Sequence, residues 1–236
     1  MSADEALERL AAASRRITAL AVGRPLPESA LEAAAGVLSD VADALEAEAP
    51  DKKRPRSQPS AQIDPRDIFP TSPIIGRANP IAPPAELWVV EGEDGQRELR
   101  GRVTFDYQYE GPPTCVHGGV IAELFDEMLG AANIVADNAG MTGTLTIRYR
   151  KVTPLLVPLD LVARTTGSER RKVFAWGGIY HGGELTAEAE GIFISMQPGR
   201  MLDIVTANAK EATGVVVDPD FIDLVAEAAG GEGGPI

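Results

Sequence analysis

Apolar and polar residues alternate along most of the chain after residue 85, a two-residue period that is typical of half-buried β-strands. The clearest stretch is LRGRVTFDYQY at 99–109, which is predicted to pair through the turn EGEDGQ with a strand at 86–90. Four more strands are predicted further along the chain. They are TGTLTIRYRKV, LDLVARTT, KVFAWGGIY and LTAEAEGIFISM, with turn segments PLLVP, GSERR and HGGE between them.

A period close to 3.6 residues runs from Gly118 to about Asp137 and predicts one long helix. Its apolar stripe consists of Ile121, Leu124, Phe125, Met128 and Leu129. A strand pair, a long helix and then a run of antiparallel strands is an α+β arrangement.

The first 49 residues show helical spacing in two stretches around the break GRPLPES, and they predict a helical hairpin. The apolar positions of this hairpin include Leu7, Leu10, Ala11, Ile17, Leu31, Leu38, Val41 and Leu45. Residues 50–69 form a proline-rich linker, because proline removes N–H donors and forces extended or turn geometry. A folded domain is expected at 70–198, followed by a tail at 199–236 with one short helix in DPDFIDLVAEAAGG.

Charge and cysteine content exclude several classes of protein. The net charge of -13 argues against a general binder of nucleic acid or of anionic membranes, because either needs a broad basic field. The single cysteine cannot form an internal disulfide, and the opening MSADEALERL carries acids where a secretory signal would be basic and then apolar. No segment has the uncharged apolar length of a membrane span. We therefore expect a cytoplasmic protein.

The tripeptide HGG occurs twice, at 117–119 and at 181–183. The second copy lies between two strand patterns, where paired glycines supply the positive φ angles of a hairpin turn. The first copy opens the long helix, so Gly118 and Gly119 can present backbone N–H groups to a polarised carbonyl oxygen at the positive end of the helix dipole. The glycines could equally serve a tight entry of the loop into the helix, and the two interpretations stay open on geometry alone.

Asp126 lies within the long helix and shares a face with a stripe of small residues that lets a ligand or another backbone approach. The other members of this stripe are Gly119, Ala122, Gly130 and Asn133. The alternative is an acid that is solvated or paired with Arg148 or Arg150.

Gly118 and Asp126 are eight residues apart, which is about 12 Å along one helix. They are therefore too far apart to act on one reacting carbon within one subunit. Two such helices packed antiparallel about a two-fold axis would bring the glycine end of one toward the acid of the other. The spacing predicts that any site built from these residues is shared by two subunits of a dimer.

The segment VHGGVIAELFDEMLG at 116–130 resembles the hotdog-fold acyl-CoA thioesterases of the PaaI-like branch, whose signature is HGG, six residues and an acid. It is preceded by a strand and YEGPP and followed by TLTIRYRKVTPLLVP, and the resemblance covers roughly residues 70–198, with GRANPIAPP as the arm before the first strand. The resemblance implies a hotdog fold, in which a curved antiparallel sheet wraps a long helix. The N-terminal hairpin would be an extension of this fold.

The resemblance also implies hydrolysis of an acyl-CoA thioester, as in lipid metabolism, by a homodimer or a dimer of dimers. Coenzyme A would then be part of the substrate and not a cofactor. By the same resemblance the Gly118 N–H polarises the thioester carbonyl, and Asp126 acts as general base or nucleophile. His117 would shape the loop, and either Thr142 or Thr144 would hold the attacking water.

Two further features of the family have candidate counterparts. Many relatives carry Asn or Gln in the loop before the histidine, where this chain has EGPPTC, and Thr114 and Glu110 are the candidate substitutes. The phosphates of coenzyme A could be received by a set of basic residues, although solvated strand and turn charges are the alternative. This set is Arg148, Arg150, Lys151, Arg170, Arg171 and Lys172.

Other functions fit the residues less well. A hotdog hydratase would place a histidine about five residues after the acid, where this chain has Ala131. Two histidines and one cysteine cannot supply an ordinary zinc shell. Cys115 and His117 could form a nucleophilic pair, but an inert thiol is the simpler interpretation. The alternative of a different class is a non-catalytic module of hotdog fold that binds acyl-CoA or serves assembly.

Overall fold

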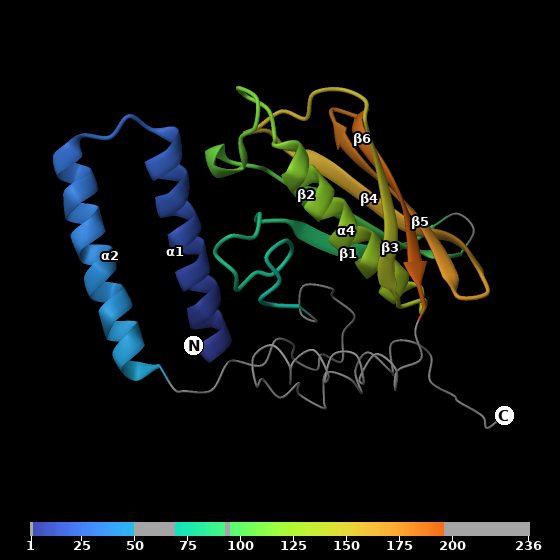
Figure 1. Ribbon diagram of the computed structural model, residues 1–236, viewed down its shortest axis with the longest axis horizontal. Coiled ribbons are helices and arrows are strands. Elements are labelled where there is room, and N and C mark those ends of the chain that lie inside the picture. The colour runs from blue at the N-terminus through green and yellow to red at the C-terminus, as the bar shows by residue number, and fades with distance from the viewer. Residues whose placement is uncertain (1, 50–68, 93–94, 196–236) are drawn as a thin grey trace.

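The computed structural model describes residues 2–49, 69–92 and 95–195 (Figure 1). The helices are α1 (Ala3–Gly23), α2 (Glu28–Glu48) and α4 (Gly118–Val135), with a 3-10 helix η1 (Tyr107–Tyr109). The strands are β1 (Glu86–Glu91), β2 (Arg97–Val103), β3 (Met141–Tyr149), β4 (Leu159–Glu169), β5 (Lys172–His181) and β6 (Glu184–Ile194). The predicted linker up to residue 68 and the predicted helix in the tail lie outside the described residues.

The six strands form one antiparallel sheet in the order β1-β2-β4-β5-β6-β3, and α4 lies along one face of it (Figure 1). The strand β3 follows α4 in the chain. It pairs only with β6 and forms one edge of the sheet within the described residues. The predicted α+β arrangement of a strand pair, a long helix and a run of antiparallel strands is confirmed.

The apolar stripe predicted for α4 is buried against the sheet, and Leu124 and Phe125 are both 0% exposed. These side chains join Leu99, Leu161 and other strand residues in one hydrophobic cluster. Burying a side chain of this size stabilises the fold by about 1.5–3 kcal/mol. The packing fixes the rotation of α4 about its axis and so determines which of its side chains face away from the sheet.

The strand predicted at 99–109 ends earlier than its pattern, because β2 stops at Val103. The alternation continues beyond it because Phe105 and Tyr109 still point into the core, where their rings meet edge to face at 5.5 Å. The Asp106 side chain accepts a hydrogen bond of 2.8 Å from the Tyr107 N–H and starts η1. The prediction of strand from 104 to 109 is therefore wrong.

Of two predicted turns, one is confirmed and the other is shorter than predicted. The second HGG copy is the turn between β5 and β6, with φ of 57° at Gly182 and 83° at Gly183, as predicted. The predicted turn GSERR is shorter than expected, because Gly167 to Glu169 belong to β4 and continue its pairing with β5 past a register shift. Only Arg170 and Arg171 separate these two strands.

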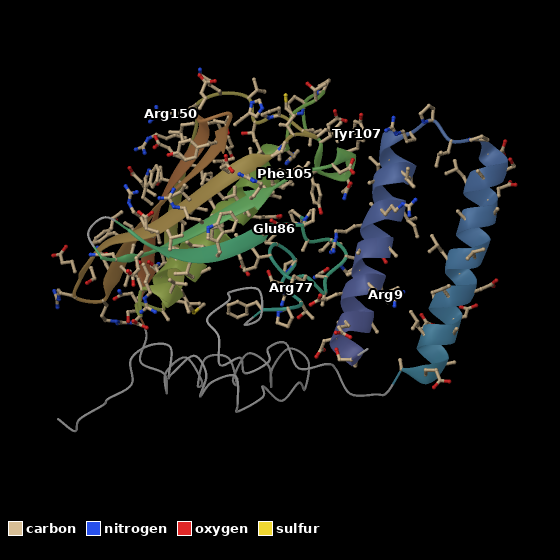
Figure 2. The ribbon with its side chains drawn as sticks, turned by 180° about the vertical axis from the view of Figure 1, so that it is seen from behind. Arg9, Arg77, Glu86, Phe105, Tyr107 and Arg150 are labelled. Atoms are coloured by element: carbon tan, nitrogen blue, oxygen red, sulfur yellow. The ribbon has the colours of Figure 1, made fainter. Side chains whose placement is uncertain are left out.

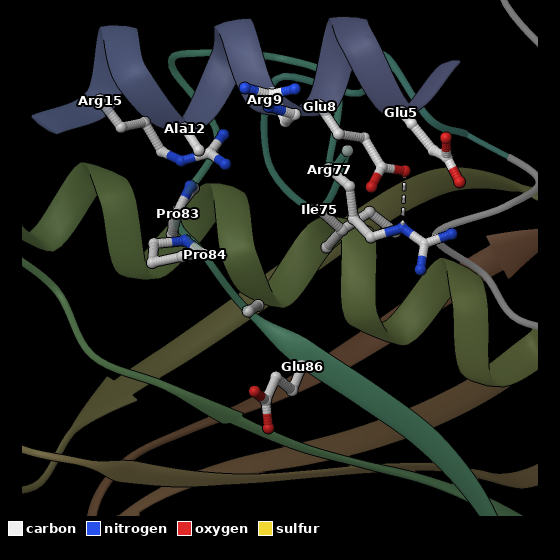
Figure 3. Close-up of a pocket in the computed structure, with 12 residues that line it drawn as sticks. Glu5, Glu8, Arg9, Ala12, Arg15, Ile75, Arg77, Pro83, Pro84 and Glu86 are labelled. Carbon is white, nitrogen blue, oxygen red and sulfur yellow. Dashed lines mark ion pairs between the residues drawn. The ribbon is translucent and has the colours of Figure 1, made fainter. Parts of the chain in front are cut away.

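Both predicted N-terminal helices are present, and α1 packs against the arm at 69–85 and against η1. The Arg15 Nη1 atom donates to the Asn79 carbonyl at 2.7 Å, and Arg77 Nε lies 3.4 Å from Glu8 Oε1 (Figure 3). A cavity of about 760 Å³ lies between this part of α1 and the arm. In the view from behind, Arg77 and Tyr107 lie on the side of the sheet domain that faces α1 (Figure 2).

The face of α1 that packs against the sheet domain is not the face that carries its large apolar residues. Ala11 is 1% exposed at the docking face, whereas Leu10 and Ile17 are 42% and 39% exposed. At Gly23 an added Cβ would lie 2.2 Å from a ring carbon of Tyr107, so only glycine permits this approach. No residue of α2 is buried, and α2 lies on the far side of α1 from the sheet (Figures 1 and 2).

Candidate active site

The helix α4 begins with His117 as its N-cap residue. The His117 Nδ1 atom accepts a hydrogen bond of 2.9 Å from the Gly119 N–H, as an N-cap side chain does. The Gly119 N–H is thereby occupied, contrary to the expectation that both glycines present bare donors. The Gly118 N–H has no intrahelical acceptor at this position and no acceptor among the described residues.

The loop before His117 is held by hydrogen bonds within it and by backbone bonds to residues 153–155. The Glu110 carboxylate accepts a hydrogen bond of 2.7 Å from the Thr114 N–H, and the Gly111 N–H donates to the Cys115 carbonyl at 2.9 Å. An added Cβ at Gly111 would lie 2.7 Å from the His117 Cα, so this close packing needs glycine. Glu110 and Thr114, the candidate substitutes for an amide contact, are thus bonded to each other within the loop.

Cys115 and His117 each have another partner. The Cys115 Sγ atom donates to the Pro113 carbonyl at 3.3 Å, and the His117 Nδ1 atom is held by Gly119. The structure therefore favours the inert thiol over a Cys–His nucleophilic pair.

The Asp126 carboxylate accepts a hydrogen bond of 2.8 Å from the Thr142 hydroxyl on β3. The alternative partners for this acid are engaged elsewhere, because Arg148 lies 3.1 Å from Glu190 and Arg150 pairs with Glu188. Of the two threonines predicted for this position, Thr142 is the one that reaches the acid. A register shift between Thr142 and Thr144 interrupts the strand's alternation at this point.

The N-terminus of α4 is hydrogen-bonded to the C-terminal end of β3. The Tyr149 hydroxyl donates to the Gly118 carbonyl at 2.9 Å. Tyr149 was not predicted as a site residue, because nothing in the sequence fixes the alignment of a strand along a helix. Since β3 runs antiparallel to α4, its two ends hold the two positions to which the sequence assigns chemistry.

The small-residue stripe of α4 does not form one open face. Asn133 is fully buried, and its Oδ1 accepts a hydrogen bond of 2.8 Å from the Thr165 hydroxyl of β4. Gly119, Ala122, Asp126 and Gly130 retain some exposure. The approach predicted from this stripe is therefore limited to its members from Gly119 to Gly130.

Asp126 opens into a cavity of about 820 Å³, which lies within the usual volume range of small-molecule sites. Four parts of the chain line it. They are α1 (Ser14, Thr18), the arm (Pro73, Ile74, Pro80, Ile81), η1 (Gln108, Tyr109) and α4 (Glu123, Asp126, Glu127). Gly118 does not line this cavity, and none of the residues from α1, the arm and η1 was predicted as a site residue, because their approach to α4 is a tertiary contact.

Several polar groups around this cavity are already engaged. Ser72 donates to the Glu127 carboxylate at 2.7 Å, and the Tyr109 hydroxyl donates to the Ile81 carbonyl at 3.0 Å. Burial raises the pKa of Tyr109 above its ordinary value, which keeps the hydroxyl protonated as a donor. Gln108 differs, because its Oε1 atom is buried and has no hydrogen-bond partner among the described residues.

The basic residues predicted for the coenzyme A phosphates fall into two separate groups. Arg148 and Arg150 pair with glutamates of β6, and Lys151 pairs with Glu184 at the start of that strand. Arg170 and Arg171 form the turn between β4 and β5, and Arg171 Nε donates to the Ser195 carbonyl beyond the other end of β6. Glu190, the partner of Arg148, is five residues before Ser195, which is about 16 Å along an extended strand, so these pairings hold the two groups at separate places along β6.

Among the described residues, no group of three or more His, Cys, Asp or Glu side chains is placed to hold a metal ion. None of the helices within the described ranges combines the length and the apolar character needed to cross a membrane.

The six-stranded antiparallel sheet around a long helix is shared with a class of known proteins. A crystal structure described as that of a thioesterase superfamily protein is 33% identical to this chain, with a TM-score of 0.68. The alignment covers 80% of this chain and 94% of the other. The chain belongs to the thioesterase superfamily, and the predicted hotdog α+β fold is confirmed.

Two curated relatives carry a more specific name. The acyl-coenzyme A thioesterase THEM4 of Xenopus laevis is 34% identical over 91 residues, 38% of this chain and 41% of the relative. THEM4 of Mus musculus is 35% identical over 95 residues, 39% of this chain and 41% of the relative. The chain thus spans about two fifths of the length of these relatives. No family model matches the chain.

Proposed function

We propose that the protein hydrolyses acyl-CoA thioesters and that Asp126 is its general base or nucleophile. The observation that carries this proposal is the hydrogen bond of 2.8 Å from Thr142 to Asp126, at a cavity of small-molecule size. Membership of the thioesterase superfamily and the names of the THEM4 relatives point to the same chemistry. Assignment to the PaaI-like branch rests on the HGG-x6-Asp pattern.

The chemistry needs a hydrogen-bond donor for the oxygen that becomes negative and a carboxylate close to the reacting carbon. As the thioester carbonyl is attacked, its oxygen gains negative charge, which the Gly118 N–H at the helix N-terminus stabilises. As a general base, Asp126 takes a proton from the attacking water; the C–S bond then breaks and coenzyme A leaves as a thiolate that is protonated. As a nucleophile, the Asp126 carboxylate attacks the carbonyl carbon, the C–S bond breaks and coenzyme A leaves as the thiolate; water then hydrolyses the mixed anhydride to the free acid and the Asp126 carboxylate. In either route the Thr142 hydroxyl orients the carboxylate.

We also propose that each site is shared by two subunits of a homodimer. Within one chain, Gly118 and Asp126 lie about 12 Å apart along the helix, and Gly118 does not line the Asp126 cavity. Within the described residues β3 is an edge of the sheet, and its outer side presents backbone groups that a second copy could pair with. If two β3 strands pair antiparallel, the Thr142 end of one lies beside the Tyr149 end of the other. Asp126 of one subunit then approaches Gly118 of the other, twice.

The activity is tested by measuring the release of coenzyme A from a panel of acyl-CoAs, with Asp126→Asn as the central variant. Asp126→Asn is expected to lower kcat by about a hundredfold or more, while the protein stays folded. Asp160→Asn is the matched control, because it neutralises an exposed carboxylate whose partner is Arg102 on the neighbouring strand. Turnover of Asp126→Asn near that of Asp160→Asn would refute the role of Asp126. Binding of acyl-CoA without any turnover by the unaltered protein would favour the non-catalytic binding module.

A further inference from the structure

The wall of the Asp126 cavity that lies across from α4 comes from the N-terminal part of the chain. Ser14 and Thr18 of α1 line it together with residues of the proline-rich arm. The HGG-x6-Asp pattern assigns no role to α1, which the sequence placed outside the hotdog domain. Its place in the structure gives this helix a direct contact with whatever occupies the cavity.

The two residues that α1 adds to this wall, Ser14 and Thr18, carry hydroxyl groups, but their protons are not free to donate into the cavity. The Ser14 hydroxyl donates to the Leu10 carbonyl at 2.9 Å, and the Thr18 hydroxyl donates to the Ser14 carbonyl at 3.0 Å. The Tyr109 hydroxyl is held in the same way by Ile81. With these protons used, the wall offers mainly carbon atoms, to which the arm adds two prolines and two isoleucines. An apolar chain fits such a surface.

The opposite side of the cavity is acidic. Glu123, Asp126 and Glu127 all line it, and no Lys or Arg is present among its lining residues in the described part of the chain. Glu127 is held by Ser72, whereas Glu123 is exposed. An acyl chain that ends in a carboxylate would meet like charges here without a cation to offset them.

We propose that the Asp126 cavity is the acyl-binding pocket and that α1 and the arm act as its selective wall, which admits uncharged acyl chains and limits their length. This inference rests on the proposed function, because it takes the occupant to be the acyl group of the thioester. Thr18 and Ile81, which both belong to this wall, set the length limit, and Glu123 discriminates against a terminal carboxylate.

The length limit is tested on the full chain with saturated acyl-CoAs from acetyl to palmitoyl. Thr18→Phe places a larger side chain on the wall, so its kcat/KM for long chains is expected to fall about tenfold more than that for short chains. Ile81→Ala removes side-chain volume and should shift the preference toward longer chains; the Tyr109 hydrogen bond to its backbone carbonyl is retained. Ala13→Phe is the control, because Ala13 is exposed on α1 and does not line the cavity.

The charge preference is tested with pairs of acyl-CoAs of equal length, one with a terminal methyl group and one with a terminal carboxylate. The unaltered protein should prefer the methyl member, and Glu123→Gln should reduce this preference severalfold. Equal use of both members by the unaltered protein would contradict the role of the acidic side.

The outcomes separate the inference from the proposed activity. If the unaltered protein hydrolyses thioesters and Thr18→Phe changes all chain lengths equally, or matches Ala13→Phe, the wall assignment is wrong and the activity stands. If no thioester is hydrolysed, the activity is wrong, and the binding of non-hydrolysable acyl-CoA thioethers by the same variants still tests the wall. A length dependence of binding that Thr18→Phe shifts would then support the pocket, and an unshifted dependence would overturn it.

Discussion

At the scale of single residues, the account depends on one hydroxyl group of β3 that reaches Asp126. A hydrogen bond to a charged group contributes about 1.5–3 kcal/mol, which corresponds to roughly a tenfold or larger change in rate. Thr142→Val is therefore expected to lower kcat/KM for acyl-CoA by about tenfold or more, and Thr142→Ser should retain most of it. Thr144→Val is the matched control, because Thr144 is exposed on the same strand. Equal activities of the two valine variants would rule out the role of Thr142.

The residues that the sequence could name are those whose relation is local. His117, Gly118 and Asp126 lie on one helix, so the period of the helix was enough to place them relative to one another. The choice between Thr142 and Thr144 needed the register shift at Gly143, and the contact of Tyr149 needed the alignment of β3 along α4. These last features arise from tertiary packing, which no single stretch of sequence encodes.

The ion pair of Glu188 gives a pH dependence of stability. The hydrogen bond from Arg150 lowers the pKa of Glu188 below its ordinary value of 4.5, and the indole N–H of Trp176 also favours the carboxylate. A lowered folded-state pKa means that the stabilisation is present above about pH 4.5 and is lost as the pH falls through the folded-state value. The gain is about 1 kcal/mol or less, because Arg150 is half exposed.

Glu188→Gln should therefore be less stable than the unaltered protein near pH 7, and the difference in unfolding free energy should shrink as the pH falls below 4.5. Chemical denaturation at a series of pH values measures this difference. A difference that stays constant down to acid pH, or grows, would show that the ion pair is not its origin.

At the scale of elements, the hydrophobic pattern predicted which segments become helix or strand better than it predicted where they stop. The alternation at 99–109 reports which side chains face the core, and Phe105 and Tyr109 do so from a loop and a 3-10 helix. Likewise the apolar positions of α1 correctly indicated a helix, but among them Ala11 lies at its docking face while Leu10 and Ile17 stay exposed. That face depends on small residues such as Ala11 and Gly23 that allow close approach to a partner element.

The turn between β5 and β6 tests the interpretation of the second HGG copy. Gly182 has a φ of 57°, in the left-handed region that costs other residues about 1–2 kcal/mol. Gly182→Ala is expected to lower the unfolding free energy by about that amount without changing kcat. Gly36→Ala is the matched control, because Gly36 lies within α2, has open space around its Cα, and should gain helix propensity. Equal stabilities of the two variants would contradict the requirement for glycine in the turn.

At the scale of the whole molecule, the separation of Gly118 from Asp126 along α4 determines what kind of site is available. One chain supplies a helix N-terminus anchored by Tyr149 and an acid anchored by Thr142, at opposite ends of the same edge strand. A two-fold arrangement of two chains brings unlike ends together and produces two equivalent sites. The sequence predicts this sharing from helix geometry, and the sharing stays a prediction.

A mixed dimer tests the shared site most directly. Gly118→Val disturbs the N–H end of each site and Asp126→Asn removes its carboxylate, so each homodimer should be inactive. In a heterodimer of the two variants, one site collects both changes and the other collects none. Heterodimers isolated with two different affinity tags after mild dissociation and mixing should therefore recover about half of the wild-type activity per dimer. Folded heterodimers as inactive as both parent proteins would show that Gly118 and Asp126 serve the same subunit's site.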